Sequence, residues 1–100
     1  MAEPALNVAK AGARRIRLRG HVQGVGFRPF VYRLACELGV VGQVQNQLGE
    51  VEVIASASPA TLDRFVADLV DRAPPLSSPS LVEVADVEAA YWEVYFTYRN

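Results

Sequence analysis

The chain has 100 residues, of which 51% are hydrophobic and 21% charged, and its formal net charge is −1. This size allows one hydrophobic core, and the near-neutral charge argues against a partner as strongly charged as nucleic acid. The single cysteine, Cys36, excludes an internal disulfide and a cysteine-based zinc site made by this chain alone. No run approaches the roughly 18 apolar residues of a membrane span. We therefore expect a cytoplasmic monomer that neither binds nucleic acid nor enters a membrane.

The first half of the chain predicts a strand followed by a helix. Residues 1 to 13 are mixed in character and are expected to form a disordered tail, so that residues 14 to 100 make up the domain. From Arg15 to Val22, apolar residues alternate with basic ones, and a period of two predicts a strand. From Phe27 to Leu38, apolar residues recur every three or four positions, which predicts an amphipathic helix that ends at Gly39.

The second half predicts a hairpin, a second helix and two more strands. In chain order these are strands over 40–48 and 50–56, a helix that begins at Pro59 and stops before Pro74, and strands over 81–87 and 91–98. The order is β-α-β-β-α-β with an added terminal strand. It predicts an α+β fold of the ferredoxin-like kind, in which two helices cover one face of a four- to five-stranded antiparallel sheet.

The turn between the first strand and the first helix predicts a phosphate site. Its two glycines permit positive φ and allow backbone N–H groups to approach a ligand closely. Several N–H groups at the start of a helix bind a small oxyanion, and a guanidinium fork there can hold two phosphate oxygens. The candidate phosphate-binding residues are Gln23, Gly24, Val25, Gly26, Phe27 and Arg28.

The expected topology brings a second residue to this turn. The first two strands run the same way, with the third inserted antiparallel between them, so that their carboxyl ends lie at one edge of the sheet. Asn46 near the end of the second strand is then two strand spacings from the turn, roughly 10 Å at backbone level. Arg28 and Asn46 could share one bound phosphate and one water.

The run from Gly20 to Arg28 resembles the signature of the acylphosphatase family, small metal-free enzymes that hydrolyse carboxyl–phosphate anhydrides. Its continuation, Pro29 to Ala35, resembles the N-terminal acylphosphatase-like domain of hydrogenase-maturation carbamoyltransferases (HypF type). The family also carries an asparagine in a pattern similar to Gly42 to Gly49. The resemblance implies that Arg28 and the turn amides bind the phosphoryl group, that Asn46 orients the attacking water, and that no metal or cofactor is needed.

The resemblance further implies carbamoyl phosphate as the substrate and the rest of a hydrogenase-maturation protein as a partner. The cysteine-rich modules of those proteins are absent, so we expect an excised domain or a free-standing relative. One alternative is a non-catalytic module that binds phosphate or acyl phosphate within a larger enzyme. A second is an RNA-binding domain of the same strand order, but its first and third strands would need exposed aromatic residues. These strands carry arginine, valine and glutamate instead.

Overall fold

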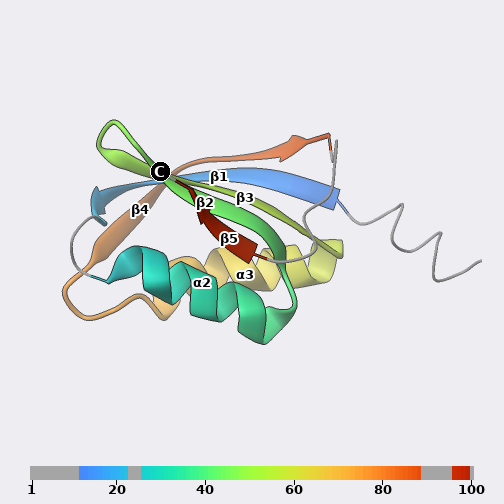
Figure 1. Ribbon diagram of the computed structural model, residues 1–100, viewed down its shortest axis with the longest axis horizontal. Coiled ribbons are helices and arrows are strands. Elements are labelled where there is room, and N and C mark those ends of the chain that lie inside the picture. The colour runs from blue at the N-terminus through green and yellow to red at the C-terminus, as the bar shows by residue number, and fades with distance from the viewer. Residues whose placement is uncertain (1–11, 23–25, 89–95, 100) are drawn as a thin grey trace, which may run out of the picture.

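The computed structural model describes residues 12–22, 26–88 and 96–99. Two helices lie side by side on one face of a five-stranded sheet (Figure 1). In chain order the elements are β1 (Gly12–His21), α2 (Phe27–Leu38), β2 (Val41–Gln47), β3 (Glu50–Ala57), α3 (Pro59–Asp71), β4 (Ser78–Val87) and β5 (Phe96–Arg99).

The strand order across the sheet is β4-β1-β3-β2-β5. The first four strands in this order are joined by antiparallel ladders, whereas β5 pairs with β2 in parallel. The predicted ferredoxin-like fold is confirmed, and the parallel pairing of β5 is a detail that the strand pattern did not indicate. Of the strand predicted over 91–98, residues 96–98 lie in β5, and 91–95 lie outside the described residues.

Two strands begin earlier than their sequence pattern predicted. β1 starts at Gly12, where it pairs with Ala57, so that the last two residues of the predicted tail belong to the sheet. β4 starts at Ser78, which pairs with His21. In both segments the additional residues are small or polar, and the backbone ladder defines the strand without apolar alternation.

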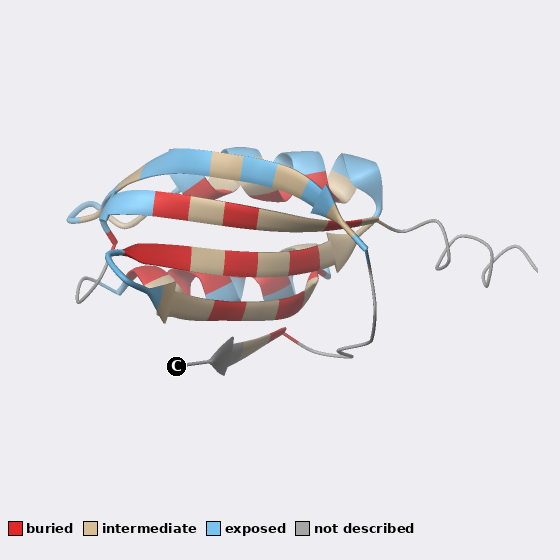
Figure 2. Cartoon of the chain, turned by 90° about the horizontal axis from the view of Figure 1, so that it is seen from above, coloured by how far each residue is buried: buried red, intermediate tan, exposed pale blue. Residues whose placement is uncertain are grey.

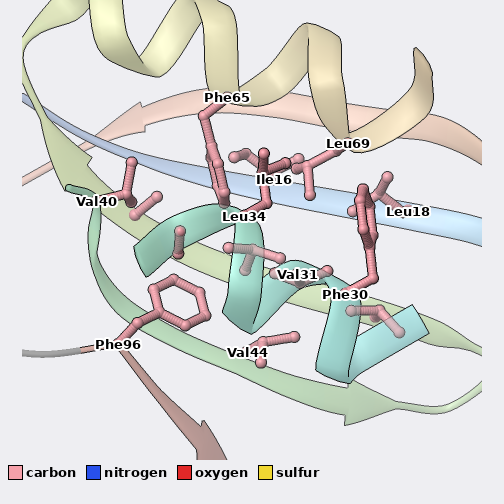
Figure 3. Packing of buried hydrophobic residues seen from close by; sticks show 14 of the residues in the cluster. Ile16, Leu18, Phe30, Val31, Leu34, Val40, Val44, Phe65, Leu69 and Phe96 are labelled. Atoms are coloured by element: carbon pink, nitrogen blue, oxygen red, sulfur yellow. The ribbon is translucent and has the colours of Figure 1, made fainter. Parts of the chain in front are cut away.

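The core lies between the sheet and the two helices. Burial alternates along the central strands, with every second residue directed at the helices (Figure 2). Burying one such side chain contributes about 1.5–3 kcal/mol. Figure 3 shows the side chains that meet there, from Phe30, Val31 and Leu34 of α2, Phe65 and Leu69 of α3, and Ile16, Leu18 and Val44 of the sheet.

Capping residues that can be identified in the sequence define two of the helix ends. Ser58 caps α3, since its Oγ accepts a hydrogen bond from the N–H of Thr61 at 3.3 Å and Pro59 follows in the first turn. Gly39 ends α2 in the left-handed conformation, and its N–H is directed at the carbonyls of Ala35 and Cys36. Neither of these two described helices is long and apolar enough to cross a membrane.

Candidate functional site

The glycine turn connects the end of β1 to the start of α2. Gly26 is the N-cap of α2 and has a φ of 82°, in the region that favours glycine. Its carbonyl accepts the N–H of Phe30 at 3.1 Å, which closes the first helical turn. A glycine cap has no side chain to satisfy the leading N–H groups of the helix, and no acidic residue lies in the first turn. Three of the candidate phosphate-binding residues lie outside the described residues, namely Gln23, Gly24 and Val25.

The first two residues of α2 have different environments. Phe27 is buried in the core, where its ring lies 5.7 Å from that of Phe30, so that its side chain anchors the helix start. Arg28 is half-buried at the edge of the apolar stripe. Phe27 could therefore serve a ligand only through its backbone, while Arg28 has a side chain that can reach one.

Asn46 lies one residue before the end of β2. Asn46 and Leu18 of β1 both pair with Val51 of β3, so Leu18 and Asn46 are two strand spacings apart, roughly 10 Å at backbone level. Side chains two residues apart share a sheet face, so Asn46 lies on the same side as the fully buried Val44, the side that the helices cover.

The side-chain oxygen of Asn46 is buried, and it accepts no hydrogen bond from any residue that the structure describes. A buried polar atom left in this state costs roughly 1–3 kcal/mol. Such atoms are rare in native proteins, and a bound ligand or an ordered water commonly satisfies them. Asn46 is therefore suited to hold a small polar ligand.

The elements that carry these residues meet at one end of the molecule. Figure 1 shows the end of β1, the start of α2 and the β2–β3 hairpin at the same end of the sheet. The predicted parallel course of β1 and β2, with β3 between them, is confirmed by the register. The binding roles of Arg28 and Asn46 stay predictions.

The open face of the sheet carries an ion-pair network that the sequence pattern did not reveal. The alternation in β1 places its arginines on one strand face, which predicts solvated side chains. In the structure, Arg17 donates to Glu50 through Nε at 2.9 Å and to Glu83 at 2.8 Å. Arg19 donates to the same Glu50 carboxylate at 2.6 Å. Glu50 is only 8% exposed. The network follows from the ladder between β1 and β3, which places Glu50 opposite Arg19.

These contacts shift the protonation equilibria of the network. Hydrogen bonds from Arg17 and then Arg19 lower the pKa of the Glu50 carboxyl below its ordinary value. The hydrogen bond from Arg17 likewise lowers the pKa of Glu83. Glu50 and Glu83 in turn raise the pKa of Arg17. Glu50, Glu83 and Arg17 are thus charged at neutral pH.

The sequence also makes a prediction for two single residues. His21 shares the strand face of the arginines, which predicts a surface residue, and it is exposed at the end of β1. Cys36 lies between the apolar positions of the first helix, which predicts a partly buried thiol, but it is exposed. Within the described residues, no group of three or more His, Cys, Asp or Glu side chains is arranged to hold a metal ion.

Comparison with known sequences identifies the family. Residues 14–97 match the model of the acylphosphatase family. An acylphosphatase of Archaeoglobus fulgidus is 42% identical over 84 residues, which cover 83% of this chain and 93% of that protein. Carbamoyltransferase HypF2 of Cupriavidus necator is 56% identical over 63 residues, which cover 63% of this chain and 8% of that protein. The chain matches only 8% to 11% of the length of four such carbamoyltransferases.

Solved structures agree with this result. An acylphosphatase from Coxiella burnetii superposes with a TM-score of 0.81 at 26% identity, over 91% of this chain and 95% of that one. A full-length HypF in its phosphate- and nucleotide-bound form gives 0.83 at 28% identity, over 90% of this chain and 12% of that one. The resemblance inferred from the glycine turn is confirmed, and the chain belongs to the acylphosphatase family.

Proposed function

We propose that the chain hydrolyses carboxyl–phosphate anhydrides without a metal ion or cofactor. Family membership supports this activity, as does the similarity to a protein named acylphosphatase along nearly its whole length. In the reaction, the oxygen of a water molecule bonds to phosphorus, the bond from phosphorus to the acyl oxygen breaks, and the carboxylate leaves. The protons of the water stay on the product phosphate or pass to solvent. A carboxylate is a good leaving group, so the protein mainly has to position the reactants and stabilise charge on the phosphoryl oxygens.

In the proposed mechanism the two sides of the site have separate tasks. The backbone N–H groups of residues 23–28 and the guanidinium of Arg28 hold the phosphoryl oxygens at the start of α2. The side chain of Asn46 holds the attacking water on the side of the phosphorus opposite the leaving acyl oxygen. Because neither task requires a proton-accepting side chain, the mechanism does not depend on a general base. Loss of one preorganised donor to a transition-state oxyanion typically reduces the rate ~100- to 1000-fold.

The observation that carries the proposal is the buried oxygen of Asn46. It lies on the helix-covered side of the sheet, at the end where α2 begins, and it has no hydrogen-bond partner within the described residues. A water held between this oxygen and a bound phosphate would satisfy it. Without a partner, this oxygen destabilises the fold, and in the proposed mechanism it holds the attacking water. Groups that lower stability in this way are typical of functional sites.

We further propose carbamoyl phosphate as the natural substrate, and a longer carbamoyltransferase as the setting in which the domain works. This step is supported by the relatives of that name, of which the chain matches about a tenth. The same short match favours a second candidate, a domain that binds phosphate or acyl phosphate within a larger enzyme and does not turn it over.

Kinetics with three substrates separates these possibilities. Release of inorganic phosphate from benzoyl, acetyl and carbamoyl phosphate would be followed with and without EDTA. We expect turnover of all three, unaffected by EDTA, with the highest kcat/KM for carbamoyl phosphate. Phosphate binding without turnover of any substrate would favour the binding module, and a requirement for metal would contradict the proposed mechanism.

A further inference from the structure

Two neighbouring strands of the sheet, β1 and β3, are paired up to the edge of the candidate site, where β3 begins at Glu50. The ladder between them ends where Arg19 pairs with Glu50. β1 nevertheless continues for two residues, Gly20 and His21, which pair only with β4. Gly20 has a φ of 111°, and a Cβ there would collide with the carbonyl oxygen of Ser78 in β4. The glycine therefore allows the end of β1 to lie close to β4 beyond the point where its ladder with β3 ends.

Glu50 lies at this fork, the point where β1 continues past the first residue of β3, and its hydrogen bonds tie the two strands together. It is the first residue of β3, directly after the hairpin turn, and its carboxylate accepts hydrogen bonds from Arg17 at 2.9 and 3.3 Å and from Arg19 at 2.6 Å. Arg17 also reaches Glu83 of β4 at 2.8 Å. One continuous set of charge-assisted hydrogen bonds thus links β4, β1 and β3 at the last point where β1 and β3 are in register.

The strand that leads into the phosphate turn and the strand that carries Asn46 do not pair with each other. β1 leads into the phosphate turn and β2 carries Asn46, but β3 lies between these strands. The hairpin strand β2 pairs with β3 up to Gln47, which is opposite Glu50. Glu50 is on the open face, whereas Asn46 is on the helix-covered face, so Glu50 cannot touch a substrate bound beside Asn46. Any effect of Glu50 on the reaction must pass through the backbone.

We propose that Glu50 is a positioning residue that fixes where Asn46 stands relative to the phosphate turn. This inference rests on the proposed hydrolysis of acyl phosphates. Phosphate is held by the turn and Arg28, all on the β1 side of the fork. The attacking water is held from the β2 side. Loosening the fork therefore leaves phosphate binding intact and misplaces the water, which lowers kcat and leaves affinity for phosphate unchanged.

The chain offers a matched control for this effect. Glu52 lies two residues further along β3 on the same open face, where it accepts a long hydrogen bond of 3.4 Å from Gln47. Glu50→Gln and Glu52→Gln remove the same charge from the same strand face. Only Glu50→Gln replaces the carboxylate that both Arg17 and Arg19 share. A third variant, Arg19→Gln, removes one of these donors and leaves Arg17 with both carboxylates.

The test measures kcat for benzoyl phosphate, the inhibition constant of inorganic phosphate, and the thermal midpoint of each variant. We expect Glu50→Gln to lower kcat by on the order of 10- to 100-fold, the range in which small misplacements act. The inhibition constant should change less than about twofold, because phosphate contacts are unaffected. Glu52→Gln should match the wild type, and Arg19→Gln should fall between the two. Adding Arg19→Gln to Glu50→Gln should lower kcat no further.

Different failures are distinguishable. If the wild type hydrolyses no acyl phosphate, both this inference and the proposed function are wrong. If the wild type is active and Glu50→Gln matches Glu52→Gln, the inference alone is overturned. If kcat and phosphate affinity fall together and in proportion to the unfolded fraction, Glu50 contributes to stability only. This result would also overturn the inference. If Glu50→Gln fails to fold, the same comparison is made with Arg19→Gln.

Discussion

Replacing Asn46 by alanine should remove activity without removing stability. Alanine deletes the buried oxygen that has no hydrogen-bond partner in the described part of the chain, which relieves roughly 1–3 kcal/mol. Against this, losing buried side-chain atoms beyond Cβ costs about 0.8 kcal/mol per methylene equivalent. Together the two effects raise the free energy of unfolding by about 0–2 kcal/mol. Most substitutions at partly buried positions lower the free energy of unfolding. An unchanged or higher value for Asn46→Ala would therefore support the unsatisfied oxygen.

Two assays on the same samples test this prediction. Urea unfolding followed by far-UV circular dichroism gives the stability, and a rise of about 1 kcal/mol moves the midpoint of a small domain by up to about 1 M. Release of phosphate from benzoyl phosphate gives the activity, for which we expect a loss of ~100- to 1000-fold. Gln45→Ala, the neighbouring position on the opposite face of β2, serves as the control and should keep wild-type activity. An Asn46→Ala variant that is active, or that is less stable by more than about 1 kcal/mol, would refute the assignment of Asn46 to the site.

Three further predictions concern the helix start, the sheet and the ion-pair network. Arg28→Ala should lower kcat/KM by at least ~100-fold with folding kept, whereas Arg33→Ala, an exposed arginine on the same helix, should not; equal activities would exclude a role for Arg28. Gly42→Ala should destabilise by at least about 1–3 kcal/mol, the typical cost of such a backbone conformation, because its φ is 139°. A Cβ at this position would also collide with the carbonyl oxygen of Ile54. Gly12→Ala has open space and should change stability by less than about 0.5 kcal/mol in urea unfolding, so similar losses in both variants would count against backbone strain as the cause. The folded-state pKa of Glu50 is lowered by Arg17 and Arg19, so the stability it contributes is present above its unfolded pKa of about 4.3 and is lost as pH falls through the folded pKa. The stability difference between wild type and Glu50→Gln should therefore be largest near neutral pH and shrink on acidification; a difference that grows at low pH would contradict the ion-pair description.

The fold was predictable because its signals are local. The bounds predicted for the first helix, Phe27 to Leu38, are those of α2, since the apolar spacing and the Gly39 cap both mark them. The second helix begins as its Ser58-Pro59 cap predicts. Strand ends were less predictable, because the first residues of β4 are held by pairing with β1 and carry no apolar alternation.

The site residues named from the sequence stay predictions, whereas the contacts that support them could not be predicted at all. The glycine turn and Asn46 could be identified because a family signature contains them. Glu50 could not, because an isolated glutamate at the start of a strand resembles any surface residue. Its burial arises only when β1 and β3 come into register and two arginines close over it. The buried oxygen of Asn46 likewise depends on the packing of the helices, which no sequence pattern specifies.

The most direct test of the central proposal is a crystal structure of the protein grown with inorganic phosphate. The proposal predicts one phosphate at the start of α2, bound by backbone N–H groups of residues 23–28 and by the guanidinium of Arg28. A water should lie between the phosphate and the side chain of Asn46. A phosphate bound elsewhere, or Arg28 and Asn46 directed to opposite sides of the molecule, would contradict the account.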